Sequence, residues 1–416
     1  MEDELSLVVF NASLYCIWAL YFVRKYGITI ATFPMLLWAG ASLANIYYFT
    51  SDLKFHTLHD RITLIPYLYL FALVCVSFIP LIKFDYKSIR VIEVNSKLFS
   101  YVSFFFIFFS LIGFIPNLKY LLTHSIDATS FLEAYEDKAS GALQILTGLP
   151  HHSMQIIRRM RGLIPILMMM SFTSSVKVGA WIKYGLVISQ LGLFIDYLNR
   201  AERFGLITDL FMLTFLFFML YPFINEKIRK KVTLFGGFIL VVIVGSIVMI
   251  TISRFGENEA DNYIWYNLSL YFGESFSNFN GDLWNMSSFT DGLNCFKYII
   301  NRFFMEGDAT RNVDLLESIT HRRMYVFYTF VGDFFIDFGP IGAAFIVIGS
   351  SFVFIKLTEV SSITSFSKIL LICLYTKVLL MGYTYWSYLT APLEPVVAIV
   401  LSILFNISLP PKKIES

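Results

Sequence analysis

Arginines and carboxylates gather at a few points of a chain that is otherwise very apolar. The first point is the stretch IDYLNRAERFGLITDL (residues 195–210), which places Arg200 and Arg203 between two hydrophobic runs. An arginine side chain carries a planar fork that holds phosphate or carboxylate oxygens bidentately. The pair therefore predicts a site for an anionic ligand. The alternative is a lock between the two helices, for instance between Arg203 and Asp209.

A second group of polar residues follows the longest loop of the chain. His321, Arg322 and Arg323 precede a hydrophobic run that contains Asp333 and Asp337. Cations can stabilise a negatively charged leaving group, and a neighbouring base can accept a proton. If the run is helical, its two aspartates share one face. Residues 324–357 are too many for one upright span, so we expect a short surface or re-entrant helix near 325–334 that leads into the membrane helix. We expect a general base here, either the histidine or the aspartate pair.

Two further stretches offer contacts to a ligand. HHSMQIIRRMRG (residues 151–162) carries Arg158 and Arg161, which would bind either substrate or lipid headgroups. Arg254 opens a long loop rich in aromatic and polar residues, a composition suited to carbohydrate or to a belt on the membrane surface. The aromatic candidates for substrate contact are Tyr263, Tyr266 and, at the end of the loop, Tyr325. No histidine stands at metal-ligand spacing with carboxylates or cysteines, and no nucleotide-binding loop is present, so we expect no cofactor.

The composition is typical of a helical membrane protein that crosses the bilayer many times. The chain has 416 residues, of which 57% are hydrophobic and 15% charged, and its mean hydropathy is +0.67. A net charge of +2 argues against a nucleic-acid partner. We expect an all-α fold, a single membrane domain over residues 1–416, with long outer loops at 118–161 and 254–324, and with short helices in the larger loop. About eleven membrane segments are predicted, at 6–23, 28–48, 62–82, 98–117, 162–176, 179–198, 204–224, 232–253, 335–355, 367–386 and 390–408.

The distribution of basic residues predicts the orientation. The most basic short loop, NEKIRKK (residues 225–231), should be cytoplasmic, and alternation from it places the N-terminus outside and the C-terminus in the cytoplasm. The inner side then carries 13 Lys and 3 Arg, whereas the outer side carries 4 Lys and 11 Arg. A preference for arginine on one side only indicates an outward-facing site for a phosphorylated or carboxylated ligand.

Three stretches of the chain resemble the bacterial O-antigen (oligosaccharide repeat unit) polymerases, the Wzy-type family. One is the outer turn LNRAERFGLI (residues 198–207), and another is SRFGENEADNYIWYNLSLYFG (residues 253–273), which opens the long loop. The third is MYVFYTFVGDFFIDFGPIGAAFIVIG (residues 324–349), which follows that loop. The likeness extends over most of the chain from about residue 160.

The resemblance implies a GT-C-type membrane fold in the bacterial inner membrane and a glycosyltransferase that needs no metal. Its substrate would be an oligosaccharide carried on undecaprenyl diphosphate, polymerised with inversion into O-antigen or a capsular-type polysaccharide. Membrane lipids and a chain-length regulator are the further partners that the family suggests. Carried onto this chain, Arg200, Arg203 and Arg254 would hold diphosphate, and the residues that complete the site would be His321, Arg322, Arg323, Asp333 and Asp337.

Three other functions are compatible with the same residues. A flippase or other transporter for lipid-linked glycans would also need arginines and aromatic residues, but transporters tend to have internal repeats and charges near the bilayer centre. Here only Lys377 falls in the middle of a membrane segment. An O-antigen ligase would differ from a polymerase in its acceptor alone, and a membrane acyltransferase is a weaker alternative.

Overall fold

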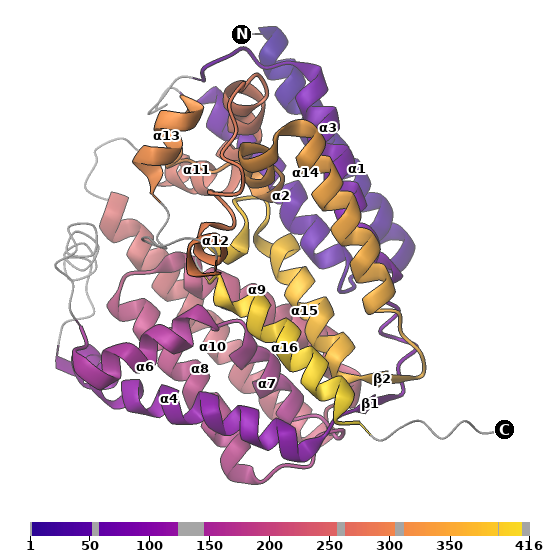
Figure 1. Cartoon of the computed structure of the whole chain (residues 1–416), viewed down its shortest axis with the longest axis vertical. Helices are drawn as coiled ribbons and strands as arrows, with labels where there is room; N and C mark the ends of the chain where they lie inside the picture. Colours follow the sequence, from indigo (N-terminus) through magenta and orange to yellow (C-terminus); the bar gives the residue numbers. More distant parts are fainter. Residues whose placement is uncertain are drawn as a thin grey trace. The chain divides into compact units, whose positions relative to one another are not determined.

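The structure is a computed structural model, and it describes residues 2–51, 58–123, 145–255, 263–303, 312–389 and 391–409. Each of the eleven hydrophobic segments predicted from the sequence contains a helix. The contacts of the chain group into two compact units, each assembled from segments that are distant in sequence (Figure 1). Unit 1 comprises residues 1–84, 260–359 and 375–392, and unit 2 comprises the remainder.

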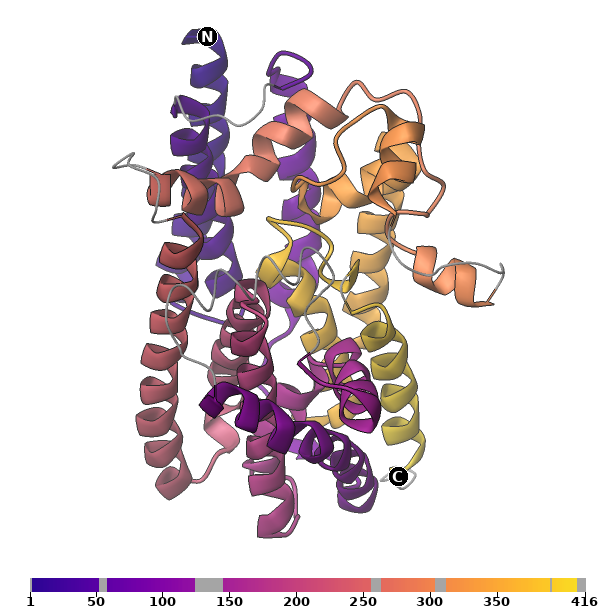
Figure 2. The same cartoon turned by 90° about the vertical axis from the view of Figure 1, so that its left-hand side faces the viewer.

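Unit 1 contains the first three helices of the chain and the long loop with the helix that follows it. In this unit α2 packs against α1 and α11, and α3 packs against α14; the pairing of α1 with α2 can be followed in Figure 2. Its elements are α1 (Glu2–Tyr26), α2 (Thr32–Thr50), α3 (Leu64–Lys83), α11 (Tyr263–Asn278), the π-helix η2 (Phe279–Leu283), α12 (Lys297–Phe303), α13 (Val313–Thr320), α14 (Thr329–Leu357) and η3 (Ser387–Leu389). The predicted outer loop 254–324 therefore contains short helices, as expected.

Unit 2 contains the arginine-bearing turn. In this unit α4 packs against α6 and α8, α7 packs against α8 and α9, and α9 packs against α10. Its elements are β1 (Val91–Glu93), α4 (Ser96–Thr123), α6 (Gly148–Arg159), α7 (Leu163–Ser171), α8 (Ala180–Asn199), α9 (Arg203–Leu220), η1 (Tyr221–Phe223), α10 (Glu226–Phe255), β2 (Ile363–Ser365) and α16 (Leu393–Ile407). Helix α15 (Phe366–Met381) begins in unit 2 and ends in unit 1.

Five helical segments are long and apolar enough to cross a membrane. They are residues 3–26, 64–83, 96–123, 203–223 and 329–357. The bilayer hydrocarbon offers no partner to backbone N–H and C=O groups, so the chain satisfies them within helices. These segments identify a candidate multi-pass membrane protein.

The outer surface of α14 has the polarity expected of a helix that faces lipid. Large apolar side chains recur at intervals of three or four residues and are exposed: Ile341, Phe345, Ile348 and Phe352. The opposite face is buried and consists of smaller residues, among them Ala343, Val347 and Ser351. A helix dissolved in water would bury the large side chains instead. Small residues inside and large ones outside are typical of helices packed within a membrane.

A kink divides α14 into two parts. Gly339 has φ 66° and ψ −172°, a conformation that L-residues with side chains rarely adopt, and Pro340 follows it. A Cβ atom at Gly339 would also lie 2.8 Å from the Phe289 ring. The prediction of a separate short helix near 325–334 is therefore correct in part: it begins at Thr329 and joins the membrane helix through this kink.

One predicted membrane segment is wrong in its length. Residues 162–176 contain only the nine-residue helix α7, which is about 14 Å long, whereas the hydrocarbon core is about 30 Å thick. The helix starts after the turn at Arg161–Gly162 and ends at Ser171, and Thr173 beyond it pairs with Ile224 in an antiparallel bridge. A second difference is a parallel pair of three-residue strands, β1 and β2, in an otherwise helical chain.

The orientation of the chain can be tested with single cysteines at exposed positions. Lys230 lies in the loop predicted to be cytoplasmic and is 80% exposed, and Trp265 lies in the predicted outer loop and is 64% exposed. In a background without the four native cysteines, we expect an impermeant thiol reagent to label Trp265→Cys but not Lys230→Cys in spheroplasts. The reverse labelling pattern would place every candidate site described below in the cytoplasm.

Candidate functional site

Four arginines of unit 2 form the arginine cluster, which consists of Arg158, Arg161, Arg200 and Arg203. They stand at the last turn of α6, in the turn before α7, at the C-terminal cap of α8 and at the start of α9. Two interhelical turns and two helix ends thus converge at one end of the unit. The sequence predicted Arg200 and Arg203 as contacts for an anionic ligand, and Arg158 and Arg161 as contacts for either substrate or lipid headgroups. The structure places all four at this end of the unit, and their role in binding stays a prediction.

Arg158 is held by the most buried carboxylate of the cluster. Its Nε and Nη2 atoms donate to the two carboxylate oxygens of Asp196 at 2.6 and 2.5 Å. Asp196 is fully buried and also accepts a hydrogen bond from Asn117 at 3.3 Å. Burial acts to lower the pKa of Arg158, but the hydrogen bonds and the charge of Asp196 outweigh burial and raise it. The pair ties α6 to α8 and fixes one guanidinium in place.

Arg161 is fixed by a second carboxylate. Its Nη1 atom lies 3.0 Å from Oε1 of Glu202, and its guanidinium carbon lies 5.7 Å from the centre of the Tyr197 ring. The next residue, Gly162, donates its backbone N–H to the buried Glu394 of α16 at 3.0 Å. A Cβ atom at Gly162 would lie 2.2 Å from that carboxylate. The turn between α6 and α7 is therefore held from two sides.

Among the ion pairs of the arginine cluster, the one made by Arg200 is the longest. Its Nε atom lies 3.9 Å from the nearest oxygen of Glu202, and this buried atom has no hydrogen-bond partner among the described residues. Burial and the nearby charge of Arg158 lower the pKa of Arg200. The following residue, Ala201, has a φ of 46°, so the turn after α8 reverses sharply. Arg200 is thus the member of the cluster best placed to bind an added anion.

Arg203 is buried and donates to Thr251 of α10 at 3.1 Å. Arg254 follows Thr251 by three residues in the same helix, so its backbone lies at the same end of the unit; its side chain lies outside the described ones. Asp209, the suggested partner of Arg203 in a lock between the two helices, accepts a hydrogen bond from Gln190 at 2.8 Å. The lock between Arg203 and Asp209 stays a prediction.

Unit 1 holds the second pair of predicted cations. Arg323 donates to the carboxylate of Asp282 at 2.5 Å, and Arg322 donates from Nε to the backbone oxygen of the same residue at 2.6 Å. Arg322 also lies 3.7 Å from Asp60. Asp282 is buried within the π-helix η2, and its other oxygen accepts the backbone N–H of His59. These arginines therefore anchor the end of the long loop.

Asp333 and Asp337 share one buried face of α14, as predicted for a helix. The side chain of Asn294 donates to Asp333 at 3.0 Å, and its backbone N–H donates to Asp337 at 2.8 Å. The other oxygen of Asp333 accepts from the backbone of Trp386, and that of Asp337 accepts from the backbone of Cys295. Every carboxylate oxygen of the pair accepts a hydrogen bond, three of them from backbone N–H groups and one from the side chain of Asn294. The role of either residue as a general base stays a prediction.

The other predicted contacts have different environments. His321 is exposed at the end of α13 and has a left-handed backbone, with φ 53°. Tyr325 is exposed, whereas Tyr266 is fully buried and stacks on Tyr48 with ring centres 6.0 Å apart. Tyr263 begins α11, and its side chain lies outside the described ones. Of the aromatic candidates with described side chains, only Tyr325 is freely accessible.

Sequence reasoning missed the buried acid of α11. Glu274 is 3% exposed, and burial raises its pKa to about 8. Its Oε1 atom accepts the backbone N–H of Phe327 at 3.1 Å, whereas Oε2 has no hydrogen-bond partner among the described residues. The available signal was its spacing, because Glu274, Asn278 and Asp282 recur every four residues.

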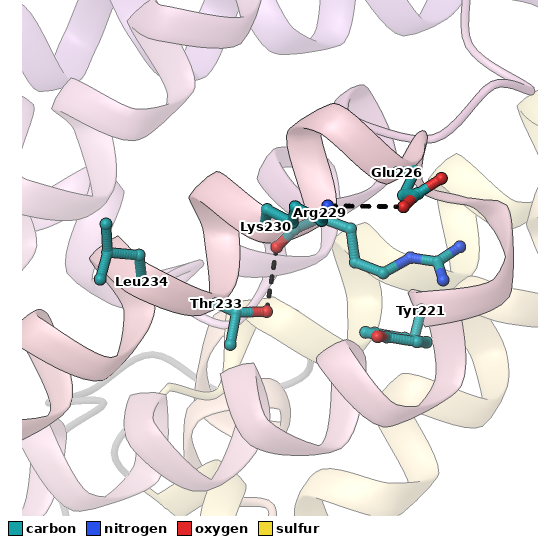
Figure 3. Close-up of a pocket in the computed structure, with 6 residues that line it drawn as sticks. All are labelled: Tyr221, Glu226, Arg229, Lys230, Thr233 and Leu234. Atoms are coloured by element: carbon teal, nitrogen blue, oxygen red, sulfur yellow. Dashed lines mark hydrogen bonds and ion pairs between the residues drawn. The ribbon is translucent and has the colours of Figure 1, made fainter.

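A surface pocket lies at the opposite end of α10 from the arginine cluster. Figure 3 shows its lining, and its volume is about 470 Å³. The guanidinium carbon of Arg229 lies 4.2 Å from the centre of the Tyr221 ring, and Lys230 lies 3.6 Å from Glu226. The remaining lining residues are Thr233 and Leu234. None of the predicted site residues lines this pocket. Within the described part of the chain, no group of three histidines, cysteines or acids is arranged to hold a metal ion.

The buried Arg158–Asp196 pair predicts a stability defect that is separate from any loss of function. The Arg158 side chain is 19% exposed, so Asp196→Asn leaves a partly buried guanidinium without its counter-charge, and about 3–5 kcal/mol, the usual cost for a fully buried pair, is the upper bound. We expect this variant to accumulate poorly and to unfold at a lower temperature in detergent. Asp85→Asn, at an exposed position of the same unit, is the matched control. Equal thermal stability of the two variants would contradict a structural role for the pair.

The chain was compared with known proteins at the level of families, sequences and structures. No family model, no curated protein and no solved structure matches it.

Proposed function

We propose that this chain is a membrane glycosyltransferase that polymerises oligosaccharide repeat units carried on undecaprenyl diphosphate, at the outer face of the bacterial inner membrane. The observation that supports the proposal most is the arginine cluster at one end of apolar helices in unit 2. Arg158 and Arg200 are partly exposed, and Arg161 and Arg203 are buried. Guanidinium groups at the ends of apolar helices are suited to a diphosphate attached to a lipid. The resemblance of three stretches of the chain to the O-antigen polymerases suggests that the group attached to the diphosphate is an oligosaccharide.

The proposed reaction is a displacement at the first sugar of the donor. The hydroxyl oxygen of an acceptor sugar bonds to the anomeric carbon, and the bond from that carbon to the diphosphate oxygen breaks. The electron pair leaves with the diphosphate, and a base takes the hydroxyl proton. Negative charge grows on the leaving group in the transition state, so preorganised guanidinium groups such as Arg200 lower the barrier. The donor is already activated, and no nucleotide is consumed.

A transporter of lipid-linked glycans is the second candidate, and one observation favours it. Lys377 is 1% exposed within α15, and its ammonium group lies 5.2 Å from the centre of the Tyr388 ring. A buried cation within a membrane segment is a common feature of transport pathways. Deleting the gene separates the two functions. Loss of a polymerase leaves surface glycan with a single repeat unit, whereas loss of a transporter removes the glycan from the surface.

Arginine geometry should matter more than charge in the cluster. Lysine keeps the charge but loses the bidentate fork, so we expect Arg200→Lys and Arg203→Lys each to slow elongation of lipid-linked repeat units by about 10²-fold or more. Arg90→Lys, at an exposed position of unit 2, should elongate at the wild-type rate. Accumulation in the membrane must be equal for the three variants. Full activity of both cluster variants would exclude the arginine-based mechanism.

The mechanism also predicts the requirements of the purified enzyme. With lipid-linked repeat units as the sole substrate, it should elongate them in the presence of EDTA and without nucleotide. Metal ions and guanidinium groups are alternative means of holding a diphosphate. An absolute need for a divalent cation, measured as loss of product in EDTA and recovery on adding Mg²⁺, would contradict the proposal.

A further inference from the structure

The surface pocket of unit 2 lies at the point where an apolar helix ends. Tyr221 lines it from η1, and its other lining residues come from the start of α10, between residues 226 and 234. The apolar segment 203–223, which is long enough to cross a membrane, ends immediately before this part of the chain. The pocket therefore lies at the depth of the lipid headgroups. Its volume of about 470 Å³ is within the range of sites that bind small ligands.

Arg229 is the cation of the pocket whose position is fixed. Its Nη2 atom donates to the backbone oxygen of Ile224 at 3.2 Å, and its guanidinium carbon lies 4.2 Å from the centre of the Tyr221 ring, beside which Figure 3 shows it. Its Nε atom has no hydrogen-bond partner among the described residues. None of the ion pairs found between described residues involves Arg229. The guanidinium is thus held in place with donors left for an anion.

Lys230 supplies a second cation at the rim of the pocket. Its ammonium group lies 3.6 Å from the carboxylate of Glu226, but the two side chains are 80% and 77% exposed. An ion pair this exposed contributes little to stability, so the ammonium group is available to a stronger anion. Lys227 and Lys231 belong to the same stretch, which therefore has four cations and one carboxylate. This balance of charge favours a negatively charged ligand.

An apolar row runs along α10 from the pocket. Leu234, Val241 and Val248 are exposed and recur every seven residues, or two helical turns, so they lie on one face. Gly237 and Gly245 lie on the same face, and a Cβ atom at either would have no other atom within 4 Å. From Leu234 to Val248 the row is about 21 Å long, and the hydrocarbon of one leaflet is about 15 Å thick. The row is long enough for an acyl chain to lie against it.

We propose that the basic pocket binds the phosphate group of an anionic phospholipid, whose acyl chain lies along the apolar row of α10. Arg229 holds the phosphate oxygens through its planar fork, and Lys230 adds a point charge. In the predicted orientation this end of unit 2 faces the cytoplasm, where basic pockets beside membrane helices bind anionic headgroups. Inorganic phosphate offers the same oxygens without an acyl chain, so the apolar row favours the lipid.

The bound lipid would stabilise the helical hairpin formed by α9 and α10. The pocket takes residues from the turn and from α10, and the other end of the hairpin carries the contact of Arg203 with Thr251. A ligand that binds the folded state alone stabilises that state by mass action. This inference concerns a site separate from the arginine cluster, and it does not depend on the reaction that the chain catalyses.

A titration of the purified full-length protein in neutral detergent tests the headgroup. The probes are phosphatidylglycerol, phosphatidylcholine with the same acyl chains, and inorganic phosphate, with bound lipid measured by native mass spectrometry. We expect phosphatidylglycerol to bind more tightly than the other two and to raise the unfolding temperature. Arg229→Gln and Lys230→Gln should each weaken its binding about fivefold, the effect of losing one cation near an anionic lipid. Lys87→Gln removes the same charge at an exposed position of unit 2 and should bind as the wild type does.

Three results of this titration would overturn the proposal. Equal affinity for the two lipids would remove the role of the headgroup charge, and an equal loss in Lys87→Gln would show that the pocket has no special part. Inorganic phosphate that binds as tightly as phosphatidylglycerol would make the pocket an anion site and not a lipid site. Because Lys230 is highly exposed, Lys230→Gln keeps the test valid if Arg229→Gln fails to accumulate.

Photochemical crosslinking tests the path of the acyl chain. The probe is phosphatidylglycerol with a diazirine in its acyl chain, mixed into phosphatidylcholine vesicles that contain the protein. We expect crosslinks to residues 234–248 of α10, at a yield that falls about fivefold in Arg229→Gln or Lys230→Gln and is unchanged in Lys87→Gln. The same yield in all variants would mean that the row contacts bulk lipid alone, and it would overturn the bound phospholipid.

Discussion

Charge buried among apolar helices is the constraint on which the structure of unit 2 depends. Asp196 is fully buried within α8, and its negative charge is balanced by a bidentate contact from Arg158. Neither residue is stable there alone, since an isolated ion at this depth costs several kcal/mol. The pair therefore fixes α6 against α8, and with it the turn that leads through Arg161 into α7. The remaining arginines of the cluster are placed by this arrangement.

Hydrophobicity alone predicted where the helices lie but not how each one is built. All eleven apolar stretches contain helices, because lipid leaves the backbone no other way to satisfy its hydrogen bonds. The short helix α7 was not foreseen. Its boundaries depend on the contact of Gly162 with Glu394, which is more than two hundred residues away in the sequence. The parallel pairing of β1 with β2 likewise joins residues 91–93 to residues 363–365, and no local pattern indicates such a partner.

The candidate residues were predicted better than their partners. Runs of arginine next to hydrophobic segments are visible in any apolar sequence, so the cluster could be anticipated. Which carboxylate balances which arginine depends on helix packing, and the contacts of Arg158 with Asp196 and of Arg161 with Glu202 could not be predicted from the sequence. Asp333 and Asp337 were correctly placed on one helix face. Their hydrogen bonds to the segment around Asn294 depend on a loop whose path the sequence does not indicate.

The hydrogen bonds that each charged residue makes within the protein distinguish residues that position the helices from residues that can bind a ligand. Nε and Nη2 of Arg158 and every carboxylate oxygen of Asp333 and Asp337 have well-placed partners, so a substrate would have to displace a protein contact to reach these atoms. Arg200 and Glu274 each keep a buried atom without a partner. Such an atom costs free energy in the folded protein, and a ligand that satisfies it recovers that free energy on binding. The fixed pairs thus hold the helices in place, and the unsatisfied atoms are where a ligand would gain most from binding.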